Sequence, residues 1–221
     1  MKKLFAAVDD YFIEKLVEND PIFEQILTNN EKYQLPPHDV SPSQGKFLYL
    51  LAKIKGAKRI LEIGTLGGYS TLWFAKAVAE NGQVISLEYD QKHAKIAQEN
   101  LALAGFSEKT TILVGAAAET LATMVQTQTS PFDLIFIDAD KENNSLYLKY
   151  AIQLAQPGTI IIGDNVVRDG AVIDSQSSDG RVIGVRSFIE DLSTSKHLTS
   201  TAIETVGVKG YDGFTISIVE E

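Results

Sequence analysis

The feature that most limits the fold is an alternation of short β-rich runs with helical segments, which begins at residue 58. The runs are apolar throughout, and the helical segments between them are amphipathic. Strands of this kind belong to a parallel sheet that helices cover on both faces, so the pattern predicts an α/β fold. The expected strands are residues 59–63, 83–87, 110–114, 133–137 and 159–162. The expected helices between them are residues 69–80, 91–104, 117–124 and 145–155.

The segments on either side of this repeat extend the predicted fold. Apolar residues at helical spacing indicate two short helices at the N-terminal end, with Pro21 between them. The run SPSQ at residues 41–44 has the pattern of a capping box, and Gly56 can end the helix that follows. After a helix at 181–192, a terminal hairpin of strands at 198–204 and 214–219 would add an antiparallel strand to the sheet. We expect one domain over residues 1–221, with a helical extension at 1–57 and the sheet at 58–221.

Composition excludes several classes of function. The chain carries 20 basic and 29 acidic residues, and its formal charge of −9 disfavours binding to nucleic acids and to anionic membranes. It has no cysteine, which excludes disulfides, thiolate zinc sites and cysteine nucleophiles. No apolar run approaches the roughly 20 residues of a membrane span, and the apolar stretch at residues 4–8 is too short for a signal peptide. We therefore expect a cytoplasmic protein.

A glycine-rich turn follows the first expected strand, in the run LEIGTLGGYS at residues 61–70. Glycines at a strand-to-helix turn let a ligand approach the backbone, and the start of the helix offers free N–H groups. The dinucleotide fingerprint G-x-G-x-x-G fails because position 66 is leucine, and the sequence has no Gly-Lys-Ser/Thr of a phosphate loop. A ligand with a pyrophosphate is therefore a poor fit for this turn.

An acidic residue, Glu88, ends the second expected strand at the position where a carboxylate can accept both hydroxyls of an adenosine ribose. Glu62 and Glu88 surround the turn, which carries no basic residue, so a cationic or uncharged adenosine ligand fits better than an anionic one. S-adenosylmethionine carries a sulfonium, an ammonium and no phosphate. The alternative is a turn that is merely tight, with Glu88 as a solvated strand end.

A second cluster of polar residues follows the fourth and fifth expected strands. Asp138 ends one strand, and Asp164 and Asn165 end the next, at the edge where open α/β sheets bind ligands. Three hard oxygen donors without His or Cys suit Mg²⁺, Mn²⁺ or Ca²⁺, although such residues also cap turns. Lys141 should overhang the same crevice, where burial and a nearby dication favour its uncharged form and make it a candidate general base.

Six runs of the sequence together resemble the cation-dependent O-methyltransferase family, which contains the catechol and caffeoyl-coenzyme A O-methyltransferases. They are SPSQGKFLYLL, LEIGTLGGYS, VISLEYD, FDLIFIDADK, GTIIIGDNVVRDG and GYDGFTISI. The resemblance covers roughly residues 38–219, is greatest to small bacterial members, and is made specific by the DADK and GDN runs. It implies a Rossmann-like class I methyltransferase fold, with a seven-stranded, mostly parallel sheet whose last strand is antiparallel. It also implies a homodimer, S-adenosylmethionine as methyl donor, and a divalent cation, here Mg²⁺ first, that chelates two vicinal oxygens of the acceptor.

The resemblance also assigns roles to individual positions. The metal ligands would be Asp138, Asp164 and Asn165, with Lys141 as the base and Asp138 beside it in the catalytic pair. The residues that line the cofactor would be Val40, Glu62, Gly64, Thr65, Ser70, Glu88, Ala117 and Asp138. Two segments depart from the family. Gly115-Ala116-Ala117 lacks the acidic or proline residue of the family's turn, and the segment at 171–181 occupies the variable insertion that shapes the acceptor pocket.

The resulting hypothesis is a metal-dependent O-methyltransferase that acts on a catechol-type small molecule such as a phenylpropanoid or flavonoid. The alternatives are a tRNA hydroxyuridine O-methyltransferase, which the charge disfavours, a non-catalytic adenosine-binding module, and an NAD-dependent oxidoreductase, which the missing glycine disfavours. The apolar residues Phe12, Leu16, Phe23 and Ile26 exceed what a layer over the sheet needs. We expect them to contribute to a dimer contact and to roof the acceptor site.

Overall fold

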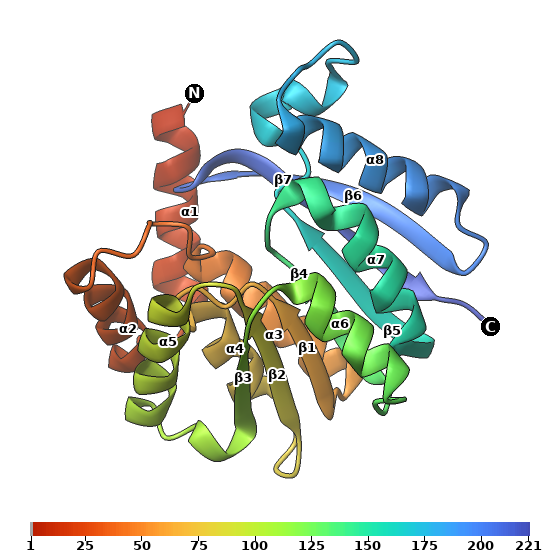
Figure 1. Cartoon of the computed structure of the whole chain (residues 1–221). Coiled ribbons are helices and arrows are strands. Elements are labelled where there is room, and N and C mark those ends of the chain that lie inside the picture. Colours follow the sequence, from red (N-terminus) through yellow and green to blue (C-terminus); the bar gives the residue numbers. More distant parts are fainter. Residues whose placement is uncertain (1) are drawn as a thin grey trace.

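The structure is a computed structural model that describes residues 2–221, and among these residues seven strands form one sheet (Figure 1). The strands are β1 (Arg59–Ile63), β2 (Gln83–Glu88), β3 (Thr110–Val114), β4 (Phe132–Ile137), β5 (Ala155–Asp164), β6 (Leu198–Gly207) and β7 (Gly210–Val219). Their order across the sheet is β3-β2-β1-β4-β5-β7-β6. The first five are mutually parallel, and β7 runs antiparallel to both β5 and β6. The predicted mixed sheet with its terminal hairpin is confirmed.

Helices cover both faces of the sheet, because successive residues of the central strands point to opposite sides. On β4, Leu134 and Phe136 pack into one core, while Ile135 and Ile137 pack into the other. The first face is covered by α3 (Pro42–Lys55), α4 (Tyr69–Ala77) and α5 (Gln91–Leu103). The second is covered by α6 (Ala117–Gln126), α7 (Asn144–Gln153) and α8 (Gly180–Thr194), which lie in front of the strands in Figure 1. Three short 3₁₀ turns are η1 (Ser107–Lys109), η2 (Lys141–Asn143) and η3 (Arg168–Ile173).

The N-cap, the proline and the terminal glycine predicted for this helix are present at α3, but the return hydrogen bond of a capping box, from the Gln44 side chain to the Ser41 N–H, is not among the contacts of residues 2–221. The Ser41 side chain accepts a hydrogen bond from the backbone N–H of Gln44 at 3.1 Å, and Pro42 occupies the first helical position. Gly56 ends the helix in the left-handed conformation, with φ of 65°. The N-cap of this helix, Ser41, directly follows Val40, one of the residues expected at the cofactor.

The two N-terminal helices, α1 (Lys2–Leu16) and α2 (Pro21–Lys32), differ in how they pack. Phe23 and Ile26 of α2 are buried in the core that α3 and α4 share, so they are unavailable to a partner chain, contrary to the expectation from sequence. Phe12 and Leu16 of α1 are 49% and 69% exposed, as that expectation requires. Every residue of α1 keeps some exposure, and the helix stands beside the β6–β7 hairpin (Figure 1).

Polar contacts rather than core packing attach α1 to the domain. Asp9 accepts hydrogen bonds from the Ser43 hydroxyl at 2.6 Å and from the Val208 N–H, in the hairpin turn, at 3.0 Å. No helix within residues 2–221 is long and apolar enough to cross a membrane.

The difference between buried and exposed isoleucines gives a test of the packing of α2. Ile26 is 0% exposed on α2, whereas Ile54 on α3 is 81% exposed. We expect Ile26→Ala to lower the free energy of unfolding by about 2–5 kcal/mol, because it leaves a cavity in the core. Ile54→Ala, the same chemical change at the surface, should change it by less than about 0.5 kcal/mol. Denaturant titration of both variants measures this, and equal effects would contradict the packing described for α2.

Candidate functional site

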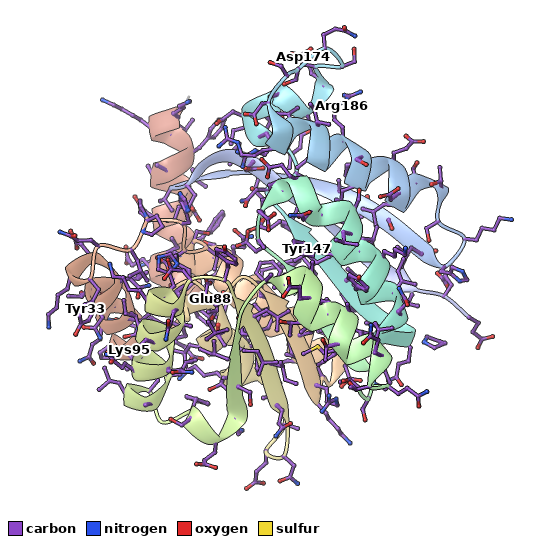
Figure 2. The ribbon with its side chains drawn as sticks, viewed as in Figure 1. Tyr33, Glu88, Lys95, Tyr147, Asp174 and Arg186 are labelled. Carbon is purple, nitrogen blue, oxygen red and sulfur yellow. The ribbon has the colours of Figure 1, made fainter. Side chains whose placement is uncertain are left out.

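The candidate site lies at the edge of the sheet where the parallel strands β1, β2, β4 and β5 end. The chain leaves β1 toward β2 on one side and returns as β4 on the other, so the strand order reverses between β1 and β4. Ligands of open α/β sheets bind at such a reversal, outside the carboxyl ends of the strands. Figure 2 labels Glu88 at this edge, with Asp174 and Arg186 on the segment that leads into and forms α8.

The glycine-rich turn brings the ends of β1 and β4 into contact. Gly64 has φ of +99°, and a Cβ atom added to it would lie 2.1 Å from the carbonyl oxygen of Asp138. Only glycine fits both this conformation and this approach. Gly68, with φ of +85°, then starts α4. The predicted strand–turn–helix is therefore present, and it lies directly against a residue of the expected metal site.

Glu88 lies beside this turn, as expected, and its carboxylate is already engaged there. Its Oε2 accepts from the backbone N–H groups of Thr65 at 3.2 Å and Leu66 at 2.9 Å, and its Oε1 accepts from that of Asp90 at 2.9 Å. Its side chain is only 10% exposed, which excludes a solvated strand end. The contacts also hold Leu66 at φ of 51°, a conformation that leucine rarely adopts. Glu88 thus stabilises the turn that it would share with a ligand.

Glu62 is fully buried and surrounded by hydroxyl groups. It accepts hydrogen bonds from Ser70 and Thr71 on α4, each at 2.5 Å, and from Ser86 on β2 at 2.6 Å. The pKa of Glu62 is raised to about 7, chiefly by burial and also by the charge of Asp138, and the three hydroxyl groups oppose this shift. The carboxylate therefore ties β1, β2 and α4 together. The sequence predicts Ser70 at this site but not Thr71 or Ser86, because the hydrogen bonds of these two residues to Glu62 form only in the folded sheet.

The three expected metal ligands lie at the ends of β4 and β5. Asp164 is 4% exposed, and burial followed by repulsion from Asp138 raises its pKa to about 7. Asn165 has φ of 55°, a conformation that asparagine tolerates, and its N–H donates to Asp164 Oδ1 at 2.9 Å. Within residues 2–221 no cluster of three or more His, Cys, Asp or Glu side chains is placed to hold a metal. A cation here would therefore need the amide oxygen of Asn165 beside the two carboxylates.

This donor set fits a hard divalent cation. Two carboxylates that repel each other in a buried corner are stabilised by positive charge between them, and oxygen ligands without nitrogen or sulfur suit Mg²⁺ or Ca²⁺. Lys141, and to a smaller extent the side chain of Gln44 in the first turn of α3, act in the opposite direction and lower the pKa of Asp164. The sequence predicts Gln44 only as part of a helix cap and gives no sign of this effect on Asp164.

Lys141 lies beside Asp138 and Asp164, and we call these three residues together with Asn165 the acidic corner. Lys141 is 6% exposed, and its Nζ lies 3.0 Å from Oδ1 of Asp138. Its backbone is held from the other side by α8, because a Cβ atom added to Gly184 would lie 2.2 Å from the carbonyl oxygen of Lys141. On the same helix, Arg186 Nη1 donates to the carbonyl of Val172 at 2.6 Å and so anchors the segment that precedes α8. The structure thus brings Asp138, Lys141 and Asp164 together, as expected.

The remaining expected cofactor residues lie around the same edge. Val40 is 7% exposed and belongs to the core on the α3 side. Ala117 is the first residue of α6, and no side chain caps that helix, because the cap position is Ala116. The departure noted in the sequence therefore leaves the start of α6 without a side-chain acceptor for its N–H groups.

The fold and sequence match known proteins over nearly their whole length. A family model described as O-methyltransferase matches residues 13–217. A catechol O-methyltransferase from Niastella koreensis is 43% identical over 218 residues, which cover 99% of each chain. The crystal structure of an O-methyltransferase from Bacillus cereus in complex with SAH has a TM-score of 0.98 and 48% identity, covering 100% of both chains. That of the O-methyltransferase TomG from Streptomyces achromogenes in complex with SAM has a TM-score of 0.96 and 40% identity, covering 100% of this chain and 99% of that one.

These matches show that the chain belongs to the O-methyltransferase family and has the Rossmann-like fold of class I methyltransferases. The resemblance inferred from the sequence is confirmed. The protein is therefore an enzyme of methyl transfer to oxygen. Both the oxidoreductase and the non-catalytic module are set aside.

The buried carboxylate of Glu62 predicts a pH effect on stability. Its pKa is about 7 in the folded protein against an ordinary value of 4.5, so between these pH values the unfolded chain loses the proton first. Ionisation therefore favours unfolding as pH rises through this window, by at most about 3 kcal/mol. We expect the free energy of unfolding of the native protein, minus that of Glu62→Gln, to fall between pH 5 and pH 8. Urea titrations measure this, with the exposed Glu99→Gln as control, and parallel pH profiles would contradict the assignment.

Proposed function

We propose that this protein transfers the methyl group of S-adenosylmethionine to one hydroxyl of a vicinal dihydroxy aromatic molecule, with the help of a divalent cation. The observation that carries the proposal is the contact between Gly64 and the carbonyl of Asp138, which joins the glycine-rich turn to the acidic corner. A site built this way can hold a donor and an acceptor next to each other. The names of the relatives agree with it, since one is a catechol O-methyltransferase and two solved structures contain SAH or SAM.

The cofactor supplies an electrophilic methyl group on a sulfonium, and the chain supplies its binding site. Glu88 would accept the ribose hydroxyls with the lone pairs that Thr65, Leu66 and Asp90 leave free. The other contacts would come from residues around the same edge of the sheet. They are Val40, Glu62, Gly64, Thr65, Ser70, Ala117 and Asp138.

Asp138, Asp164 and Asn165 would hold the cation, for which Mg²⁺ is the first candidate. When bound, a cation at this corner supplies Lewis-acid activation of a hydroxyl and orients two adjacent oxygens of the acceptor. Lys141 would accept the proton of the reacting hydroxyl at Nζ, and Asp138, 3.0 Å away, would stabilise the ammonium that results. The burial of the Lys141 side chain keeps bulk water from competing for that proton.

We further propose that the protein is a homodimer in which α1 contributes to the contact. Its exposed apolar residues lie beside β6, an edge strand exposed along most of its length, so the two elements offer one continuous surface. The sedimentation coefficient of the purified protein tests this part of the proposal. The cytoplasmic location expected from the sequence stays a prediction.

Loss of the Glu88 carboxylate should weaken cofactor binding. We expect Glu88→Ala to reduce the affinity for S-adenosylhomocysteine by about 1–3 kcal/mol, because the ribose hydroxyls lose a charged acceptor and the turn loses its brace. Isothermal titration calorimetry measures the dissociation constant. Glu99→Ala, which removes an exposed carboxylate from α5, should leave it unchanged. Equal affinities for Glu88→Ala and the native protein would remove Glu88 from the site.

Chelation of the acceptor should make the activity depend on metal and on adjacent hydroxyls. We expect EDTA to abolish turnover of caffeic acid and Mg²⁺ or Mn²⁺ to restore it, whereas p-coumaric acid, which has one hydroxyl, should barely react. Asp164→Ala should lower turnover by several orders of magnitude and change cofactor affinity far less. Asp191→Ala, which removes an exposed carboxylate near the end of α8, serves as control. Methyl transfer assays decide this. Full activity in excess EDTA would contradict the chelation mechanism. Rapid methylation of hydroxylated tRNA would favour tRNA as the acceptor.

Removal of the Lys141 amine should affect the chemical step. We expect Lys141→Met to lower kcat by about 10²–10⁴ with a smaller change in the KM for a catechol, since methionine keeps most of the unbranched apolar chain and lacks the amine. Lys149→Met, at an exposed position of α7, is the matched control. A large rise in KM at constant kcat would show that Lys141 binds the acceptor rather than taking its proton.

A further inference from the structure

A chain of buried amide side chains links α2 to the glycine-rich turn. Asn100 of α5 is 1% exposed, and its Nδ2 donates both to the carbonyl oxygen of Gly67 at 2.9 Å and to Oδ1 of Asn30 at 3.0 Å. Asn30, on α2, is 3% exposed and lies so close to the turn that a Cβ atom added to Gly67 would be 2.0 Å from its Oδ1. The backbone of the turn at Gly67 therefore packs directly against the side-chain amide of Asn30.

The same amide also holds the segment before α3. Nδ2 of Asn30 donates to Oδ1 of Asp39 at 3.0 Å, and Asp39 directly precedes Val40. The orientation of each amide is consistent along the chain, because Asn100 Oδ1 accepts from Asn29 Nδ2 at 2.9 Å, which leaves the Asn100 NH₂ group as donor and Asn30 Oδ1 as acceptor. Asn30 thus contacts two segments expected at the cofactor, although it was not expected at the site itself.

We propose that Asn30 is a positioning residue for the cofactor, which sets the separation between the Val40 segment and the Gly64–Gly68 turn. The inference rests on the proposed function, since it assumes that both segments contact S-adenosylmethionine. The proposal gives α2 a specific role: the helix is held in the core by its apolar residues, and its Asn30 side chain then fixes the positions of the two segments at the cofactor site. Only an amide suits this place, where one end must donate to a carboxylate and the other must accept from an amide.

Exchanging the donor and acceptor side chains of the Asn30–Asp39 hydrogen bond tests the proposal. In Asn30→Asp a carboxylate oxygen would face Asp39 at about the hydrogen-bond distance, so the segments should separate and the dissociation constant for S-adenosylhomocysteine should rise about tenfold. Asp39→Asn keeps the hydrogen bond by turning its amide and should stay within about twofold of the native value. The double variant Asn30→Asp/Asp39→Asn restores donor and acceptor in reverse and should recover the affinity of Asp39→Asn.

Each outcome of the titrations has one meaning. If the native protein binds S-adenosylhomocysteine and Asn30→Asp binds it equally well, the positioning role is wrong. If Asp39→Asn alone loses as much affinity as Asn30→Asp and the exchange does not rescue it, the charge of Asp39 binds the cofactor directly and the proposal is overturned. If the native protein fails to bind it, the proposed function fails instead.

Hydrogen exchange on the native protein gives a second measurement that needs no variant to fold. S-adenosylhomocysteine should slow amide exchange in α2 (Pro21–Lys32), because the bound cofactor fixes the two segments that Asn30 joins. A protection that appears in the turn and in residues 38–41 but leaves α2 unchanged would contradict the coupling. A merely structural role of Asn30 would alter the thermal stability without this ligand-dependent protection.

Discussion

The close passage of the Gly64 backbone over the carbonyl of Asp138 is the constraint on which the rest of the site depends. It fixes the ends of β1 and β4 against each other at the reversal of strand order, so the turn that would receive a cofactor and the corner that would receive an acceptor share one wall. Glu62 and Glu88 then stabilise that wall from inside, one through hydroxyl groups and the other through backbone N–H groups. Catalysis by orientation requires such a rigid shared boundary.

Much of the fold could be predicted from sequence because its signals are local. The alternation of apolar runs predicted the five parallel strands, and the cap at Ser41 and the glycine at position 56 predicted both ends of α3. Boundaries were less accurate where a strand starts ahead of its apolar run: β5 begins at Ala155 and includes Pro157 and Gly158, whereas the predicted strand begins at residue 159. The different packing of α1 and α2 was not predicted, because both helices are amphipathic and only the tertiary contacts distinguish Phe12 from Phe23.

The candidate site was predictable to the extent that its residues end strands. Asp138, Asp164 and Glu88 each end or directly follow a run with a clear period, so their convergence follows from the topology of a parallel sheet. The partners of these residues were hidden for the opposite reason. Asn30 and Asn100 are 70 positions apart, and the place of Gln44 in a capping-box pattern gives no sign that its side chain acts on Asp164. Pairings of this kind leave no trace in a single sequence.

The contact between Gly184 and Lys141 has a consequence for how the enzyme could change its substrates. Residues 174–179, ahead of α8, are mostly exposed and end at a helix whose position is fixed by that glycine, so their sequence can vary without moving the lysine. If this segment shapes the acceptor pocket, as the family resemblance implies, evolution or a designed library could vary it while Lys141 keeps its place. A side chain at position 184, by contrast, would push α8 away from Lys141, and any change of substrate made that way would also disturb the residue that we propose as the base.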